Sequence, residues 1–142
     1  MITITKKFNF EMAHLLESHK GKCINLHGHS YQMHITVTSE SLINGMVVDF
    51  GHLKKIINEL LIDEIDHSFG YNVNSNDIVS NSIANNLIIN NRKVYKFNCE
   101  TTCEEMAIFM FDLLNQPLMN EGIKLLEIKL YEGNNSYATY RK

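Results

Sequence analysis

The chain has 142 residues, of which 44% are hydrophobic, and a formal net charge of -3. This length and apolar content suit a single domain, covering 1–142, whose core needs no disulfide bonds. The negative net charge and the lack of long runs of like charge argue against nucleic acid as a primary partner.

The first residues lack the apolar stretch of a secretory signal peptide, and no uninterrupted apolar run is long enough to cross a membrane. We therefore expect a soluble, cytoplasmic protein without a membrane partner. The cysteines are odd in number and form no C-x-x-C pair, which is typical of free thiols in a reducing compartment. They are Cys23, Cys99 and Cys103.

Two strands are predicted near the N-terminus. Apolar and polar residues alternate along 2–14, which indicates a half-buried strand with His14 on its apolar side. The alternation resumes over 27–38, where His27 and His29 share the apolar parity. All three histidines are therefore expected on the buried face of neighbouring strands.

Two amphipathic helices are predicted further along the chain. The first runs from its N-cap, Asp49, to about 66. The second begins with the capping-box spacing of Thr102 and Glu105 and is expected to stop at Pro117.

The remaining segments complete an α+β pattern. Between the helices, 68–92 is expected to be mostly loop with a short helix near 83–87, followed by a possible strand over 93–99. A last strand is predicted over 126–132, and the final residue on its inward face carries a carboxylate. Its inward residues are Leu126, Ile128, Leu130 and Glu132. The order of elements favours an antiparallel sheet with helices on one face.

The sequence His27-Gly28-His29 places two imidazoles on one face of a strand, about 6–7 Å apart between α-carbons. His14 can add a third ring from the neighbouring strand. Three neutral histidines with an open fourth position are the ligand set of a catalytic zinc ion. A histidine on an apolar parity is more often an ordinary core residue, so core packing remains the alternative. His34 has the opposite parity and is left out of the set.

Cys23 lies four residues before His27, in the loop expected between the two strands. A thiolate beside a dication can accept a proton from carbon or oxygen, so Cys23 is a candidate base. The alternatives are an inert buried thiol or a fourth ligand in a closed structural zinc site. Cys99 and Cys103 have no histidine neighbours and are expected to be packing residues.

Three further ionisable residues are candidates for chemistry. Asp66 can fix the tautomer of His67 and make it a proton shuttle, although histidines at helix ends are also common caps. Glu132 on a buried parity needs a partner. A heterocycle with adjacent N–H donors would satisfy it, and so would an internal salt bridge.

The sequence from Cys23 to His29 resembles the C-x-x-x-H-G-H motif of the 6-pyruvoyltetrahydropterin synthase and 6-carboxytetrahydropterin synthase family. Further similarities are spread along nearly the whole chain. They are Phe10 to His14 (F-x-x-A-H), Gly45 to Phe50 (G-M-V-x-D-F), Asp66-His67 (D-H), and Tyr131-Glu132 with the following Asn135 to Ala138 (the last-strand glutamate segment).

The resemblance implies a T-fold, which is an antiparallel four-stranded sheet with two helices on one face. Such subunits assemble into an oligomeric barrel, so a homo-oligomer, either a trimer or a hexamer, is expected. The implied substrate is a small molecule, the reduced pterin 7,8-dihydroneopterin triphosphate.

The family also implies roles for individual residues. Zn2+ would be bound by His14, His27 and His29. Cys23 would accept the proton, with a relay completed by His67 and Glu132 and supported by Asp66. Glu132 would also anchor the pterin, together with Thr102.

Some features depart from the family pattern. Its P-T-x-E-N segment is here Thr101 to Glu105, without the proline and the asparagine, and 73–98 is longer than in compact bacterial members. The chain is most similar to the queuosine-pathway type, which forms 6-carboxy-5,6,7,8-tetrahydropterin and releases acetaldehyde and triphosphate. The alternatives are the pyruvoyl synthase, which only eliminates triphosphate, and a zinc- or pterin-binding module without turnover.

Overall fold

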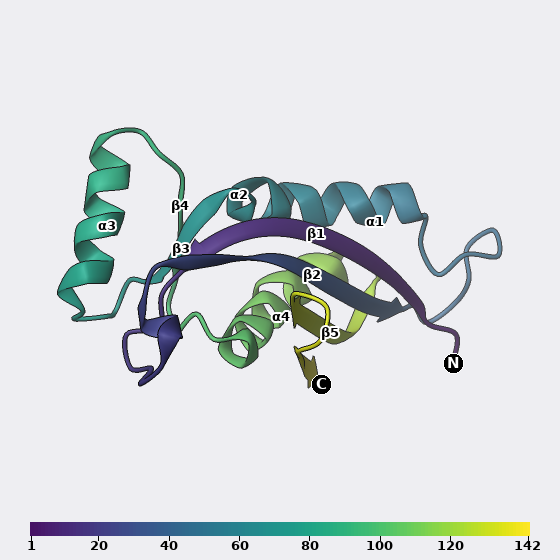
Figure 1. Ribbon diagram of the computed structural model, residues 1–142. Coiled ribbons are helices and arrows are strands. Elements are labelled where there is room, and N and C mark those ends of the chain that lie inside the picture. Colours follow the sequence, from purple (N-terminus) through teal and green to yellow (C-terminus); the bar gives the residue numbers. More distant parts are fainter.

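The computed structural model describes residues 1–142 and contains one six-stranded sheet in the order β4-β3-β1-β2-β5-β6 (Figure 1). The strands are β1 (Ile4–His14), β2 (His27–Thr38), β3 (Ser68–Asn72), β4 (Val94–Phe97), β5 (Lys124–Glu132) and β6 (Tyr137–Arg141). The antiparallel four-stranded sheet that the resemblance implies is formed by β1, β2, β5 and β6. The short strands β3 and β4 add to it in parallel, so the complete sheet is mixed.

The helices begin where the sequence places their caps. The Asp49 side chain accepts from the His52 N–H before α1 (Phe50–Ile57), which continues through the wider turn η2 (Asn58–Ile62) into α2 (Asp63–Ile65). This confirms the first predicted helix. The Thr102 side chain likewise accepts from the Glu105 N–H at the start of α4 (Cys103–Asn120).

The expected stop at Pro117 is wrong, because α4 continues past it to Asn120. A proline inside a helix lacks one N–H donor and strains the preceding turn. Here that cost falls in the final turns, where the buried Leu114 and Leu118 pack against the core. Tertiary packing therefore outweighs the local preference.

The segment between the first and last helices is more ordered than the sequence indicates. Residues 68–72, expected as loop, form β3, and the predicted short helix is the longer α3 (Ile78–Ile89), which Asp77 caps. The helix α3 packs on a small cluster of its own with Phe69, Tyr71 and Ala84 and stands at one end of the molecule (Figure 1).

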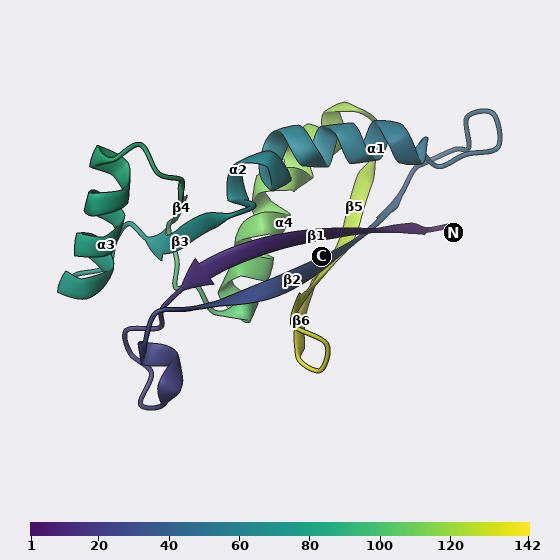
Figure 2. The same ribbon diagram turned by 45° about the horizontal axis from the view of Figure 1, so that its top comes forward.

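The main core lies between one face of the sheet and two helical segments, α1–α2 and α4 (Figure 2). Its fully buried side chains come from β2, α1, α4 and β5, for example Met33, Leu53, Met110 and Ile128. This confirms the α+β class with two helical segments on one face of the antiparallel strands. No helix of the chain is both long and apolar enough to span a bilayer.

The inward face of β5 differs from the prediction at its start. The pairing with β2 shifts between Thr36 and Val37, so that Leu125, not Leu126, takes the buried position. A bulge of this kind adds one residue to one strand and changes its parity. Beyond the bulge, Ile128 and Leu130 are buried as predicted, and Glu132 follows on the same parity.

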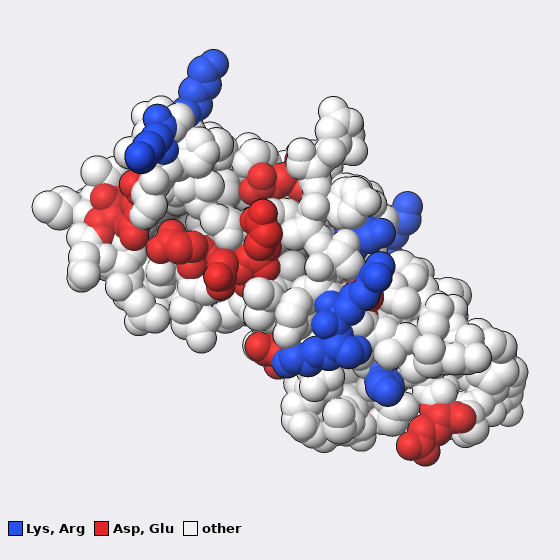
Figure 3. Space-filling model, turned by 90° about the horizontal axis from the view of Figure 1, so that it is seen from below, with Lys and Arg blue, Asp and Glu red and all other residues white.

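Charges of both signs occur on the underside of the molecule in separate groups. Figure 3 shows a band of acidic side chains beside a group of lysines and arginines. The whole chain has 16 acidic and 13 basic residues. On this face the two kinds of charge are separated from each other.

Candidate metal centre and active site

The three predicted histidines meet at one end of the core. His14 is the last residue of β1 and pairs directly with His27, the first residue of β2. His29 lies two residues further along β2, on the same face. His14 is fully buried, whereas His27 and His29 are partly exposed, so the cluster opens to the surface on the β2 side.

The rings are close enough to share one ion. The Nε2 atoms of His14 and His27 are 3.1 Å apart, and one ring nitrogen from each of the three histidines lies within 4.8 Å of the others. These are the only histidine, cysteine or acidic side chains grouped in this way. The prediction that the three histidines converge is confirmed, and the group could hold a metal ion.

Backbone contacts fix the tautomers of two of the rings. His14 Nδ1 lies 2.9 Å from the Thr101 carbonyl oxygen, and His27 Nδ1 lies 2.7 Å from the Asn25 carbonyl oxygen. A carbonyl oxygen only accepts, so both Nδ1 atoms carry the hydrogen and both Nε2 atoms present lone pairs. Two lone pairs facing each other at 3.1 Å repel unless a cation lies near them. The donor set therefore fits a metal ion such as zinc.

The protonation state of His14 suits the same role. Burial, and then the neighbouring His27, lower the pKa of His14 to about 4. A group with this pKa is neutral near pH 7, and only a neutral imidazole can coordinate a metal. Binding of a cation at neutral pH thus needs no proton to leave His14.

Thr101 is the residue of this site that the sequence analysis missed. Its side chain is 2% exposed, and its hydroxyl lies 3.2 Å from His14 Nδ1, beside the carbonyl contact. Thr102, the predicted pterin contact, has its hydroxyl engaged as the cap of α4, where it accepts from Glu105. Two consecutive threonines at a helix start are the only sequence signal for this division of roles.

Cys23 lies in a short 3-10 turn, Lys22–Ile24, within the loop between β1 and β2. It is partly buried and free, and its carbonyl accepts from the Leu16 N–H. Its sulfur is not part of the metal-ligand group. The geometry resembles an open three-histidine site more than a closed site with four ligands.

The other two cysteines behave as packing residues. Burial raises the pKa of both Cys99 and Cys103 to about 11. The Cys103 thiol donates to the Leu130 carbonyl oxygen at 3.0 Å. Both sulfurs are therefore protonated near neutral pH and poor nucleophiles.

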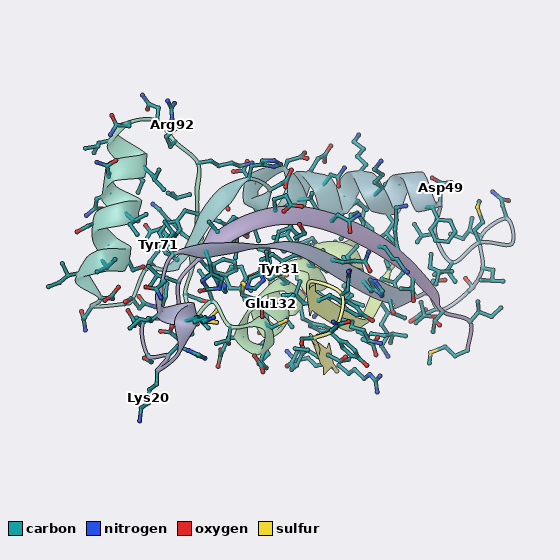
Figure 4. The ribbon with its side chains drawn as sticks, viewed as in Figure 1. Lys20, Tyr31, Asp49, Tyr71, Arg92 and Glu132 are labelled. Atoms are coloured by element: carbon teal, nitrogen blue, oxygen red, sulfur yellow. The ribbon has the colours of Figure 1, made fainter.

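Glu132 is next to the histidine cluster. It pairs with Tyr31 across β2 and β5, and its Oε1 atom is 3.8 Å from His29 Nε2. Figure 4 shows Tyr31 and Glu132 side by side below β2. No lysine or arginine lies within ion-pair distance of Glu132, so the predicted alternative of an internal salt bridge with such a residue is not found.

The Asp66-His67 pair is formed, but no contact joins it to the histidine cluster. Asp66 accepts from the Glu11 N–H at 2.8 Å and lies 3.0 Å from His67 Nδ1, and these contacts hold the pKa of Asp66 below its ordinary value despite some burial. His67 has a φ of 60°, its N–H donates to the Glu11 carbonyl, and its side chain is 75% exposed. One chain therefore does not assemble the whole predicted relay.

His34 lies on the other face of β2, as its parity predicts. Its ring packs against Tyr131 in a tilted arrangement, with 4.8 Å between centroids and 39° between planes, and lies within hydrogen-bond distance of Gln32. Burial and the neighbouring Lys7 and Lys129 lower its pKa. It takes no part in the metal-ligand group.

Comparison with known proteins identifies the family. Residues 3–142 match the sequence model of the family described as 6-pyruvoyl tetrahydropterin synthase. The chain is 36% identical to 6-carboxy-5,6,7,8-tetrahydropterin synthase from Haemophilus influenzae, over 100% of both chains. It is 32% identical to the Aquifex aeolicus protein of the same name, over 98% of this chain and 97% of that protein.

A solved structure agrees with this assignment. The fold is similar to that of Caenorhabditis elegans 6-pyruvoyl tetrahydropterin synthase, with a TM-score of 0.70, 24% identity and coverage of 99% of this chain and 95% of that chain. The whole-length similarities and the match of residues 3–142 to the family's sequence model lead to one conclusion. The chain belongs to the 6-pyruvoyl tetrahydropterin synthase family.

Proposed function

We propose that the protein is a zinc-dependent 6-carboxy-5,6,7,8-tetrahydropterin synthase that acts in the cytoplasm as part of queuosine biosynthesis. It converts 7,8-dihydroneopterin triphosphate and releases acetaldehyde and triphosphate. The observation that carries the proposal is the cluster of His14, His27 and His29 with Glu132 beside it. The full-length similarity to synthases of that name supports the choice of product.

In this proposal His14, His27 and His29 hold the zinc ion. When bound, zinc would supply a Lewis acid that polarises oxygens of the substrate's side chain. Cys23 takes a proton from that side chain, and Glu132 accepts hydrogen bonds from the amino and ring N–H groups of the pterin. Thr101 and Asn25 keep two of the rings in the tautomer that coordination requires.

The metal assignment gives a first prediction. His27→Ala should abolish stoichiometric zinc binding, because the two remaining rings leave an incomplete ligand set for a tightly held ion. Purified wild-type protein should contain about one zinc per chain, as in other three-histidine sites. Metal analysis of the purified variants measures this directly.

His34→Ala is the matched control, since His34 belongs to the same strand but lies on the other face. It should retain its zinc. Full zinc retention in His27→Ala would exclude the three-histidine site.

Product analysis tests the reaction. Incubation with 7,8-dihydroneopterin triphosphate should yield 6-carboxy-5,6,7,8-tetrahydropterin, acetaldehyde and triphosphate in equal amounts. Formation of triphosphate and the 6-pyruvoyl product without acetaldehyde would favour the pyruvoyl synthase instead. If the protein bound zinc and pterin but formed no product, the remaining interpretation would be a binding module without turnover.

The Asp66-His67 pair completes the site from a neighbouring copy in a homo-oligomer, which we expect to be a trimer or hexamer. Two observations support this part of the proposal. The pair is already formed, because Asp66 contacts His67 and also accepts from the Glu11 N–H. The His67 ring is exposed at the surface and does not belong to the chain's own cluster of three histidines. A proton shuttle must reach the reacting atoms, so a second copy of the chain is the natural source of a site for this imidazole.

A further inference from the structure

Tyr31 contacts the core, the histidine cluster and Glu132. Its side chain is 1% exposed, and its ring stacks on Phe10 with 5.0 Å between centroids and 9° between planes. The same ring meets His29 edge to face at 5.4 Å and His14 at 6.2 Å. Its position is therefore fixed by the core and by the histidine cluster together.

The hydroxyl of Tyr31 is directed at Glu132. It donates to Oε1 of Glu132 at 3.5 Å, and this is the hydroxyl's only hydrogen bond in the chain. A buried hydroxyl with a single acceptor restrains that acceptor, because leaving the hydroxyl without a partner has a free-energy cost. Tyr31 therefore interacts with Glu132 through a hydrogen bond as well as through packing.

The two oxygens of Glu132 have different surroundings. Oε1 faces both the Tyr31 hydroxyl, at 3.5 Å, and His29 Nε2, at 3.8 Å. Oε2 takes part in no hydrogen bond or ion pair of the chain, and the side chain as a whole is 26% exposed. One oxygen is occupied within the protein, and the other is free for a ligand that enters from solvent.

A carboxylate beside His29, one of the three clustered histidines, is itself a good metal ligand. If Glu132 were free to rotate towards the cluster, it could fill the fourth position of the metal and would no longer face the pterin. The tyrosine hydroxyl competes for the same oxygen and opposes that rotation.

We propose that Tyr31 is a positioning residue that holds Oε1 of Glu132 in its place beside His29, so that the carboxylate does not turn further into the histidine cluster and Oε2 stays available to the donor edge of the pterin. This inference rests on the proposed function, since it assumes a pterin at Glu132. Tyr31 does not touch the substrate in this scheme and acts only through the carboxylate.

The decisive variant is Tyr31→Phe, which keeps the ring and its stacking on Phe10 but removes the hydroxyl. The expected result is an increase of about tenfold in both KM and the Kd for 7,8-dihydroneopterin, the order of magnitude of one lost hydrogen bond to a charged acceptor. The kcat value, zinc content and melting temperature should stay near those of the wild type. Tyr95→Phe is the matched control, because Tyr95 is a partly buried tyrosine that packs on Phe97 and Phe109 away from the site.

A double-mutant cycle with Glu132→Gln tests whether Tyr31 acts through Glu132. In the Glu132→Gln background, Tyr31→Phe should change the Kd for 7,8-dihydroneopterin by less than about twofold, because the carboxylate it restrains is already absent. Equal effects in both backgrounds would overturn the proposal. So would an unchanged Kd and KM in Tyr31→Phe, which would leave only a packing role for the ring.

Two further measurements separate the possible failures. Glu132→Asp withdraws the carboxylate from both Tyr31 and the pterin, so it serves as a second background for the cycle, in which Tyr31→Phe should again change the Kd by less than about twofold. Failure of the wild-type protein to bind 7,8-dihydroneopterin or turn over its triphosphate would instead reject the proposed function itself.

Discussion

Replacing Cys23 with alanine is expected to lower turnover of 7,8-dihydroneopterin triphosphate by about 10²–10⁴-fold, the usual contribution of a general base. Zinc content and melting temperature should not change, because the metal-ligand group consists of three histidines without the cysteine sulfur. Steady-state rates, metal analysis and thermal unfolding of the same preparation measure the three quantities together.

Cys99→Ala provides the comparison for Cys23→Ala. Cys99 is also a partly buried free thiol, but burial raises its pKa to about 11 and no contact connects it to the histidines. Its replacement should leave the rate near that of the wild type. If Cys23→Ala lost its zinc together with its activity, the sulfur would be a fourth ligand, and the site would be closed and structural.

The convergence of the three histidines could be predicted from the sequence because strand parity determines it. Residues of equal parity share one face of a strand, so His27 and His29 had to lie on the side that also carries Tyr31 and Met33. The antiparallel register then places His14 opposite His27. The helix caps Asp49 and Thr102 are local signals of the same kind.

The features that the sequence did not reveal depend on contacts between distant segments. The role of Thr101 follows from the packing of the α4 start against the end of β1, 87 residues away in the chain. Strand β3 forms because it pairs with Met12 and Ala13 beyond a helix that ends at Ile65. The bulge that buries Leu125 is a property of the pairing between β2 and β5. None of these has a periodic or capping pattern.

The exposed position of His67 is likewise set by the tertiary structure and has no signal in the sequence. It allows a test of whether two neighbouring copies share one site. Cys23→Ala and His67→Ala should each be almost inactive alone, yet oligomers assembled from both variants together should regain activity. In randomly mixed oligomers, about a quarter of the sites would combine an intact Cys23 from one copy with an intact His67 from its neighbour. Co-expression with two different affinity tags, followed by tandem purification, selects oligomers that contain both variants. In these the intact combination makes up about a third of the sites of a trimer and about a quarter of the sites of a hexamer, and rate measurement gives this fraction.

The size of the recovered activity distinguishes a site shared between neighbouring copies from a site formed within one chain. If Cys23 and His67 of the same chain served one site, every site in a mixed oligomer would lack one of the two groups, and activity would stay at the level of the single variants. The His67 side chain is 75% exposed, and its only ion pair within its own chain is with Asp66, so its removal should leave the melting temperature of the subunit nearly unchanged. Co-expression of His67→Ala with Asp66→Ala is the negative control, because both variants damage the same pair and no mixed site can combine an intact Asp66 and His67. Recovery to about a third of the wild-type rate for a trimer, or about a quarter for a hexamer, with Cys23→Ala, and none with Asp66→Ala, is the result that a site shared between neighbouring copies requires.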